Sequence, residues 1–245
     1  MKGIFPGLAA IAVIAAGCAT PPPPPPVYMT ARSSASELSA NVVGTAKTEA
    51  SRPMLDAFAN AVRNELQGRG YWLDVDSPET LVELTVGERV LDRSGRNVSL
   101  AGDFSIAATV PVRHNMKLGT QTFSLQSEQT LGEEAARADL VRLALPRVHQ
   151  WVGDHAQPGD TGLDAQIVHI VGAELDPSED RRALADFIQA ARGTDGVLLV
   201  KETQRDHEAR SYKFRIVYAK GKFPPGRFLE AFLASHPELP LTQVP

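Results

Sequence analysis

The apolar residues of the chain follow two periods, one typical of α-helices and the other of β-strands. Spacing of three and four predicts an amphipathic helix over 54–66. Alternation of apolar and polar residues then predicts three strands, at 82–86, 104–110 and 122–126. Helical spacing returns over 133–151, where Pro146 should kink the helix or split it in two. The links between the three strands are too short for a crossover helix, so antiparallel pairing is expected.

The pattern repeats in the last third of the chain. An apolar strand at 167–171 precedes a helix that should begin at Pro177 and end at Gly193. Two further strands, predicted at 197–200 and 212–218, should form a hairpin that turns around residues 206–209. A final short helix contains Phe228, Leu229 and Phe232.

This order of elements indicates the α+β class, because sheets with one polar face need helices to cover the other face. We expect two small α/β sandwich domains, α-β-β-β-α and then β-α-β-β-α, after a signal peptide and a Pro-rich tether. The expected boundaries are a signal peptide and lipobox at 1–18, a Pro/Ser-rich tether at 19–36, a first domain at 37–152 and a second domain at 165–237.

The N-terminal segment has the features of a secretory signal. Met1-Lys2 supplies a positive start, and an apolar stretch at 4–16 follows it. That stretch is shorter than the roughly 20 residues that a membrane-spanning helix needs. The six prolines Pro21–Pro26 favour a polyproline II spacer, although such a run can also be a ligand for aromatic-lined grooves.

Ala15-Ala16-Gly17-Cys18 at the end of this segment resembles the lipobox of bacterial lipoproteins. The resemblance implies that Cys18 becomes the mature N-terminus and carries covalent lipid, such as palmitate, that anchors the protein in a membrane. In that family Leu is preferred where this chain has Ala15, and Ala19 instead of Asp after the cysteine points to the outer membrane, facing the periplasm. The alternatives are a plain secretory signal and an ordinary buried cysteine.

Composition excludes some function classes. The chain has a net charge of −4, which gives no general attraction to nucleic acid. Cys18 is the only cysteine of its 245 residues, so no internal disulfide can form. The sequence contains no phosphate loop, dinucleotide fingerprint, nucleophile elbow or zinc-protease helix. We therefore name no catalytic residue, expect no metal, and expect no cofactor beyond the lipid on Cys18.

Two neighbouring segments are candidates for a functional site. The acidic run from Asp74 to Glu79 lacks the glycine and the distal glutamate of a calcium loop, so we interpret it as a polar turn. The neighbouring Tyr71-Trp72 pair is either a binding anchor or part of the core.

A basic stripe on the last two strands is the most suggestive surface. We expect its side chains to point outward and to contact anionic lipid, peptidoglycan carboxylates or an acidic partner. Its residues are Lys201, Arg210, Lys213, Arg215 and Lys220. The alternative is a solvated strand edge whose charges discourage aggregation.

The lipobox, the Pro21–Pro26 tether and the helix-then-strands order up to Trp151 are together similar in organisation to two lipoprotein families. These are the lipoprotein activators of penicillin-binding proteins and the curli secretion lipoprotein. We expect a non-enzymatic accessory or assembly subunit of a cell-envelope complex, which docks through its sheet edges or the basic stripe. The alternatives are a periplasmic hydrolase and a lipoprotein that binds the cell wall or a small ligand.

Overall fold

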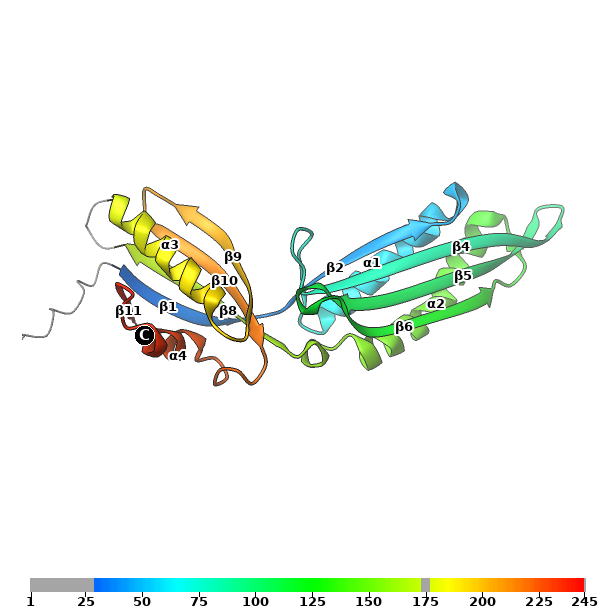
Figure 1. Ribbon diagram of the computed structural model, residues 1–245. Coiled ribbons are helices and arrows are strands. Elements are labelled where there is room, and N and C mark those ends of the chain that lie inside the picture. The colour runs from blue at the N-terminus through cyan, green and yellow to red at the C-terminus, as the bar shows by residue number, and fades with distance from the viewer. Residues whose placement is uncertain (1–28, 173–176, 245) are drawn as a thin grey trace, which may run out of the picture.

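A computed structural model describes residues 29–172 and 177–244 and has two lobes, each a sheet with helices on one face (Figure 1). This arrangement confirms the α+β class. Among the described residues, no helix is long and apolar enough to span a bilayer. The predicted signal peptide, Cys18 and Pro21–Pro26 lie outside the described residues.

The first lobe is built from the middle of the chain. Its strands are β2 (Ser39–Ala46), β3 (Trp72–Leu73), β4 (Thr80–Ser94), β5 (Asn97–Val110), β6 (Met116–Gln126) and β7 (Thr130–Leu131), and its helices are α1 (Arg52–Gly68) and α2 (Glu133–His155). The strand order is β3-β2-β4-β5-β6, with β7 paired to β5. The three predicted strands and both predicted helices are confirmed. The expected split at Pro146 is not observed, because α2 continues through this residue.

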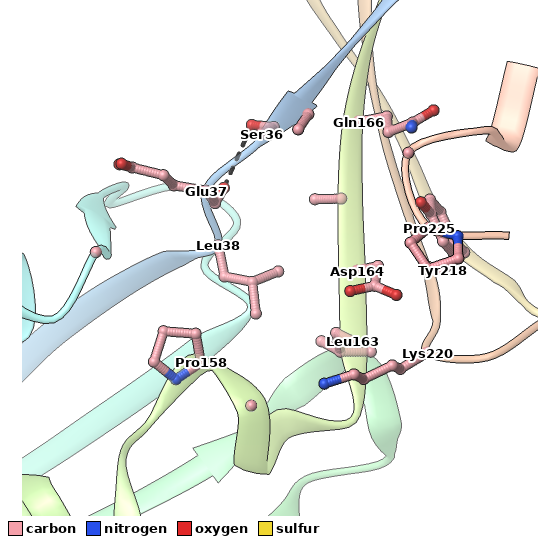
Figure 2. Close-up of a pocket in the computed structure, with 15 residues that line it drawn as sticks. Ser36, Glu37, Leu38, Pro158, Leu163, Asp164, Gln166, Tyr218, Lys220 and Pro225 are labelled. Carbon is pink, nitrogen blue, oxygen red and sulfur yellow. Dashed lines mark hydrogen bonds between the residues drawn. The ribbon is translucent and has the colours of Figure 1, made fainter. Parts of the chain in front are cut away.

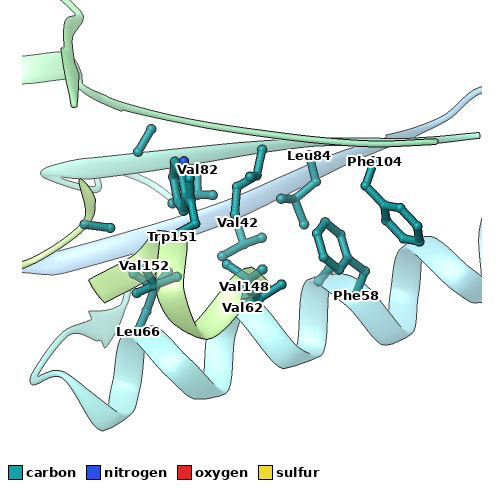
Figure 3. Packing of buried hydrophobic residues seen from close by; sticks show 14 of the residues in the cluster. Val42, Phe58, Val62, Leu66, Val82, Leu84, Phe104, Val148, Trp151 and Val152 are labelled. Atoms are coloured by element: carbon teal, nitrogen blue, oxygen red, sulfur yellow. The ribbon is translucent and has the colours of Figure 1, made fainter. Parts of the chain in front are cut away.

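Both helices of the first lobe pack on the same face of its sheet. The alternating residues of β4 and β5 place Val82, Leu84 and Phe104 on that face, where they meet Phe58 of α1 and Trp151 of α2 (Figure 3). The other face carries small polar side chains such as Ser105 and Thr122, which are joined by a hydrogen bond of 3.3 Å. Burial on one face and solvent on the other explains the period of two in the sequence.

The second lobe combines the two ends of the described chain. Its strands are β1 (Met29–Ser36), β8 (Leu163–Gly172), β9 (Val197–Asp206), β10 (Ser211–Ala219) and β11 (Leu241–Gln243), and its helices are α3 (Pro177–Gly193) and α4 (Phe228–Ser235). The strand order is β11-β1-β8-β10-β9. The α3 limits and the β9–β10 hairpin agree with the prediction.

The expectation that residues 29–36 belong to the tether is wrong. They form β1, which pairs antiparallel with β8 along its full length and parallel with β11. Only Met29 and Ala31 of this strand enter the core, and its remaining residues are partly or fully exposed. Because the segment has so few apolar residues, it resembles a linker in the sequence, although its backbone completes the sheet. The second sheet therefore extends beyond the expected limits of 165–237 at both ends.

This topology makes the first lobe an insertion in the second. After β1, residues 37–38 lead directly into β2, and the chain returns through the short 3₁₀ helix Pro158–Thr161 into β8. Met29 lies at the end of the second lobe that faces away from the junction, whereas the β4–β5 turn lies at the opposite end of the molecule (Figure 1).

Candidate functional site

The five residues of the predicted basic stripe do not share one open surface. Lys201 and Arg210 form ion pairs with Asp74 and Asp180, at 3.0 and 2.6 Å. Lys213 is half-buried on the sheet face opposite α3, and Lys220 lies exposed after β10.

The expectation that Arg215 points outward is wrong, since its side chain is only 2 % exposed. Alternation along β10 correctly separates the two faces of the strand. However, the first lobe covers the junction end of the face that carries Arg215, and no local pattern in the sequence reveals this.

Arg215 is the centre of a buried polar cluster between the lobes. Its Nε and Nη2 atoms donate to the two carboxylate oxygens of Glu79, at 3.1 and 3.0 Å, and Glu79 is fully buried. Nη2 also donates to the carbonyl oxygen of Glu37 at 2.6 Å, and Nη1 donates to the hydroxyl of Ser36. Glu79 accepts further hydrogen bonds from the backbone and the side chain of Ser39. A bidentate pair with its remaining donors satisfied is the arrangement in which a buried charge pair is tolerated.

Two further contacts hold the first lobe at the junction, one to the second lobe and one to the connection that leads into β8. Lys201 of β9 donates to Asp74 of the first lobe, and Arg113 donates to the carbonyl oxygen of Thr161 at 2.9 Å. Burial opposes ionisation of Asp74, but the hydrogen bonds from Lys201 and from the backbone outweigh it, so the pKa of Asp74 lies below its usual value. The acidic run at 74–79 is thus part of the connection between the lobes.

The two aromatic residues of the Tyr71-Trp72 pair have different environments. Tyr71 belongs to the core, and burial raises its pKa to about 12. Trp72 is 37 % exposed, and the guanidinium of Arg215 lies 5.2 Å from the centre of its ring. A cation over an indole face is a favourable contact, so Trp72 supports the junction cluster while keeping one side open to solvent.

A cavity of about 400 Å³ opens on another side of the junction (Figure 2). Its wall includes Leu38 of the first connection, Asp164 and Gln166 of β8, and Tyr218 and Lys220 of the β10 region. Gln166 is 1 % exposed, and neither atom of its amide group has a hydrogen-bond partner among the described residues. Burial, followed by the charge of Asp164, raises the pKa of Tyr218.

The cavity is suited to binding, and the buried polar cluster is suited to a rigid connection between the lobes. Within the described ranges, no group of three or more His, Cys, Asp or Glu residues gathers to hold a metal. The sequence indicates a polar turn for the run that includes Glu79, and it does not single out Ser39 or Gln166. The hydrogen bonds between Glu79 and Ser39 span 40 positions, and those between Glu79 and Arg215 span 136 positions.

The sequence matches no known family and no curated protein. In structure, the chain is similar to a minor lipoprotein from Acinetobacter baumannii (15% identity, 47% of this chain and 89% of the other, TM-score 0.31). It is also similar to lipoprotein GNA1162 from Neisseria meningitidis (9% identity, 46% of this chain and 99% of the other, TM-score 0.33). A third similar structure is a PelC dodecamer from Paraburkholderia phytofirmans (13% identity, 48% of this chain and 95% of the other, TM-score 0.29). Two of these three neighbours are described as lipoproteins.

Proposed function

We propose that the protein is a lipoprotein anchored through Cys18 in the outer membrane, and that it acts as a non-enzymatic accessory or assembly subunit of a cell-envelope complex in the periplasm. The lipobox-like sequence supports the anchor. The observation that carries the assembly role is the long β4–β5 hairpin, which projects beyond the helices at the end of the molecule opposite Met29 (Figure 1).

The far end of this hairpin carries exposed apolar side chains. Val90 is 50 % exposed, Leu91 is 43 % exposed, and Leu131 of the adjacent β7 is 76 % exposed. We call these three residues the distal patch. The β4 and β7 strands both pair with the end of β5, which brings the three residues to the same end of the sheet. Exposed apolar side chains at the end of a projecting element are typical of a protein-binding surface.

The junction gives this surface a fixed position relative to the second lobe. β1 begins 11 residues after the proposed lipid attachment and is fully paired in the second sheet. The buried Arg215–Glu79 pair connects that sheet to the first lobe. In this proposal the second lobe lies next to the membrane, and the first lobe presents the distal patch to a partner protein farther away.

Anchoring is tested by replacing the proposed lipid attachment residue. The Cys18→Ser variant should move from the membrane to the soluble fraction because no acyl chain can be attached, and mass spectrometry of the wild type should find an acylated Cys18 as the first residue. Extraction with high salt controls for peripheral binding. A wild-type chain without lipid, or a variant that stays in the membrane after the salt wash, would contradict the anchor.

A further inference from the structure

The open face of the second sheet carries a row of basic side chains. Arg32 of β1 lies directly opposite His169 of β8, and His169 lies directly opposite Lys213 of β10. Opposed residues on adjacent strands project to the same face, with Cβ atoms about 5 Å apart. The three side chains therefore form a continuous row across three strands. α3 and α4 pack on the other face of the sheet, against Val168, Ile170 and Phe214.

Other cations of this sheet are neutralised, whereas this row is not. Lys201, Arg210 and Arg215 each pair with a carboxylate. For Arg32 and Lys213, the part of the chain that the structure describes offers no ion-pair partner. Two uncompensated cations on either side of His169, in a chain of net charge −4, indicate a place where an external anion is attracted.

His169 adds hydrogen-bonding groups to the row. Its Nε2 atom lies 2.7 Å from the hydroxyl oxygen of Ser211, in a hydrogen bond whose direction depends on the tautomer. Burial lowers the pKa of His169, and the charges of Lys213 on β10 and Arg32 on β1 lower it further. A bound anion would offset that repulsion and favour the protonated ring. Guanidinium, imidazole, hydroxyl and ammonium groups thus come from neighbouring positions on one face.

We propose that Arg32, His169, Ser211 and Lys213 form a binding site for a phosphate group. We assign this phosphate group to the headgroup of an anionic phospholipid. This assignment rests on the proposed anchor at Cys18. Residues 19–28 separate that cysteine from β1, and a segment of this length extends to at most about 35 Å. The tether thus keeps Arg32 near the membrane surface and raises the local concentration of headgroups.

The test uses the non-acylated Cys18→Ser protein, so that its outcome does not depend on the anchor. Binding is measured by sedimentation with vesicles of phosphatidylglycerol or of phosphatidylcholine at low salt. We expect binding to the anionic vesicles only, and a loss of about five-fold for each of Arg32→Gln and Lys213→Gln. Lys47→Gln and Arg52→Gln are matched controls, because these exposed cations of the first lobe have no ion-pair partner among the described residues.

A pH series identifies the contribution of His169. A phosphodiester headgroup stays ionised between pH 8 and 5.5, so any strengthening over this range comes from the protein. We expect binding to strengthen as the pH falls, because protonation adds a positive charge to the row, and the His169→Gln variant should weaken this dependence without abolishing binding at pH 8.

Titration with inorganic phosphate, followed by the NMR signals of the His169 ring, distinguishes the sources of the phosphate group. A response to phosphate without vesicle binding would keep the site and overturn the headgroup assignment. No response to phosphate together with no vesicle binding, or binding that the control substitutions weaken equally, would overturn the site. The proposed anchor would fail separately, through the fractionation of the wild-type protein.

Discussion

At the scale of single residues, the junction depends on one buried charge pair. Arg215 and Glu79 come from different lobes and lose nearly all contact with water, and each is satisfied mainly by the other and by the connection at residues 36–39. Such a pair specifies one arrangement of the lobes, because moving either lobe leaves a charge unpaired in a buried environment.

Removing one partner should therefore cost more than removing both. Glu79→Gln or Arg215→Met alone should lower the free energy of unfolding by about 3–5 kcal/mol, since an uncompensated charge or donor set remains buried. The double variant should lose less than either single variant, because it leaves no unpaired charge at the junction. Denaturant unfolding of the four proteins gives this double-mutant cycle, and strict additivity would contradict a direct coupling.

At the scale of elements, β1 determines how the second lobe is completed. Its backbone pairs with both β8 and β11, while its side chains are mostly small and polar. The structure assigns stability to Met29 and Ala31 in particular, because only these two side chains of β1 reach the core.

A matched pair of substitutions tests this role of β1. Ala31→Asp should lower the free energy of unfolding by several kcal/mol because it buries a carboxylate, whereas Thr30→Asp, on the exposed side of the same strand, should change it little. Both measurements are made by chemical denaturation of the non-acylated protein. Equal, small effects would mean that residues 29–36 act as a tether.

The difference between predictable and unpredictable elements has a physical cause. Helix α1 and strands such as β5 bury many apolar side chains at regular spacing, so their period is visible in the sequence. β1 contributes mainly backbone hydrogen bonds, which leave no such period. The core face of β10 was also predictable, but the burial of Arg215 was not, because it depends on a second lobe and a carboxylate 136 positions away.

The role of Arg32 in the site on the open face of the second sheet was likewise not predictable from the sequence. In the sequence it is a single basic residue in a segment that resembles a linker, and it becomes significant only when pairing with β8 places it beside His169. Lys213 lies on a strand as predicted, but its partners in the row come from strands that are distant in the chain.

At the scale of the whole molecule, the inserted first lobe separates two surfaces. The second lobe holds β1 and the basic row near the proposed anchor, and the distal patch of Val90, Leu91 and Leu131 lies at the opposite end (Figure 1). The buried junction cluster keeps this separation fixed, which suits a subunit that presents one surface to a membrane and another to a partner.

Affinity purification of the tagged, lipidated protein from gently solubilised membranes tests this account most directly. The wild type and a Leu198→Glu control, which changes an exposed apolar residue of the second lobe, should each retain stoichiometric envelope proteins. The Val90→Glu/Leu131→Glu variant should lose them while remaining folded and in the membrane. Recovery of the wild type as a lone monomer, or equal retention of partners by the distal-patch variant, would contradict the account.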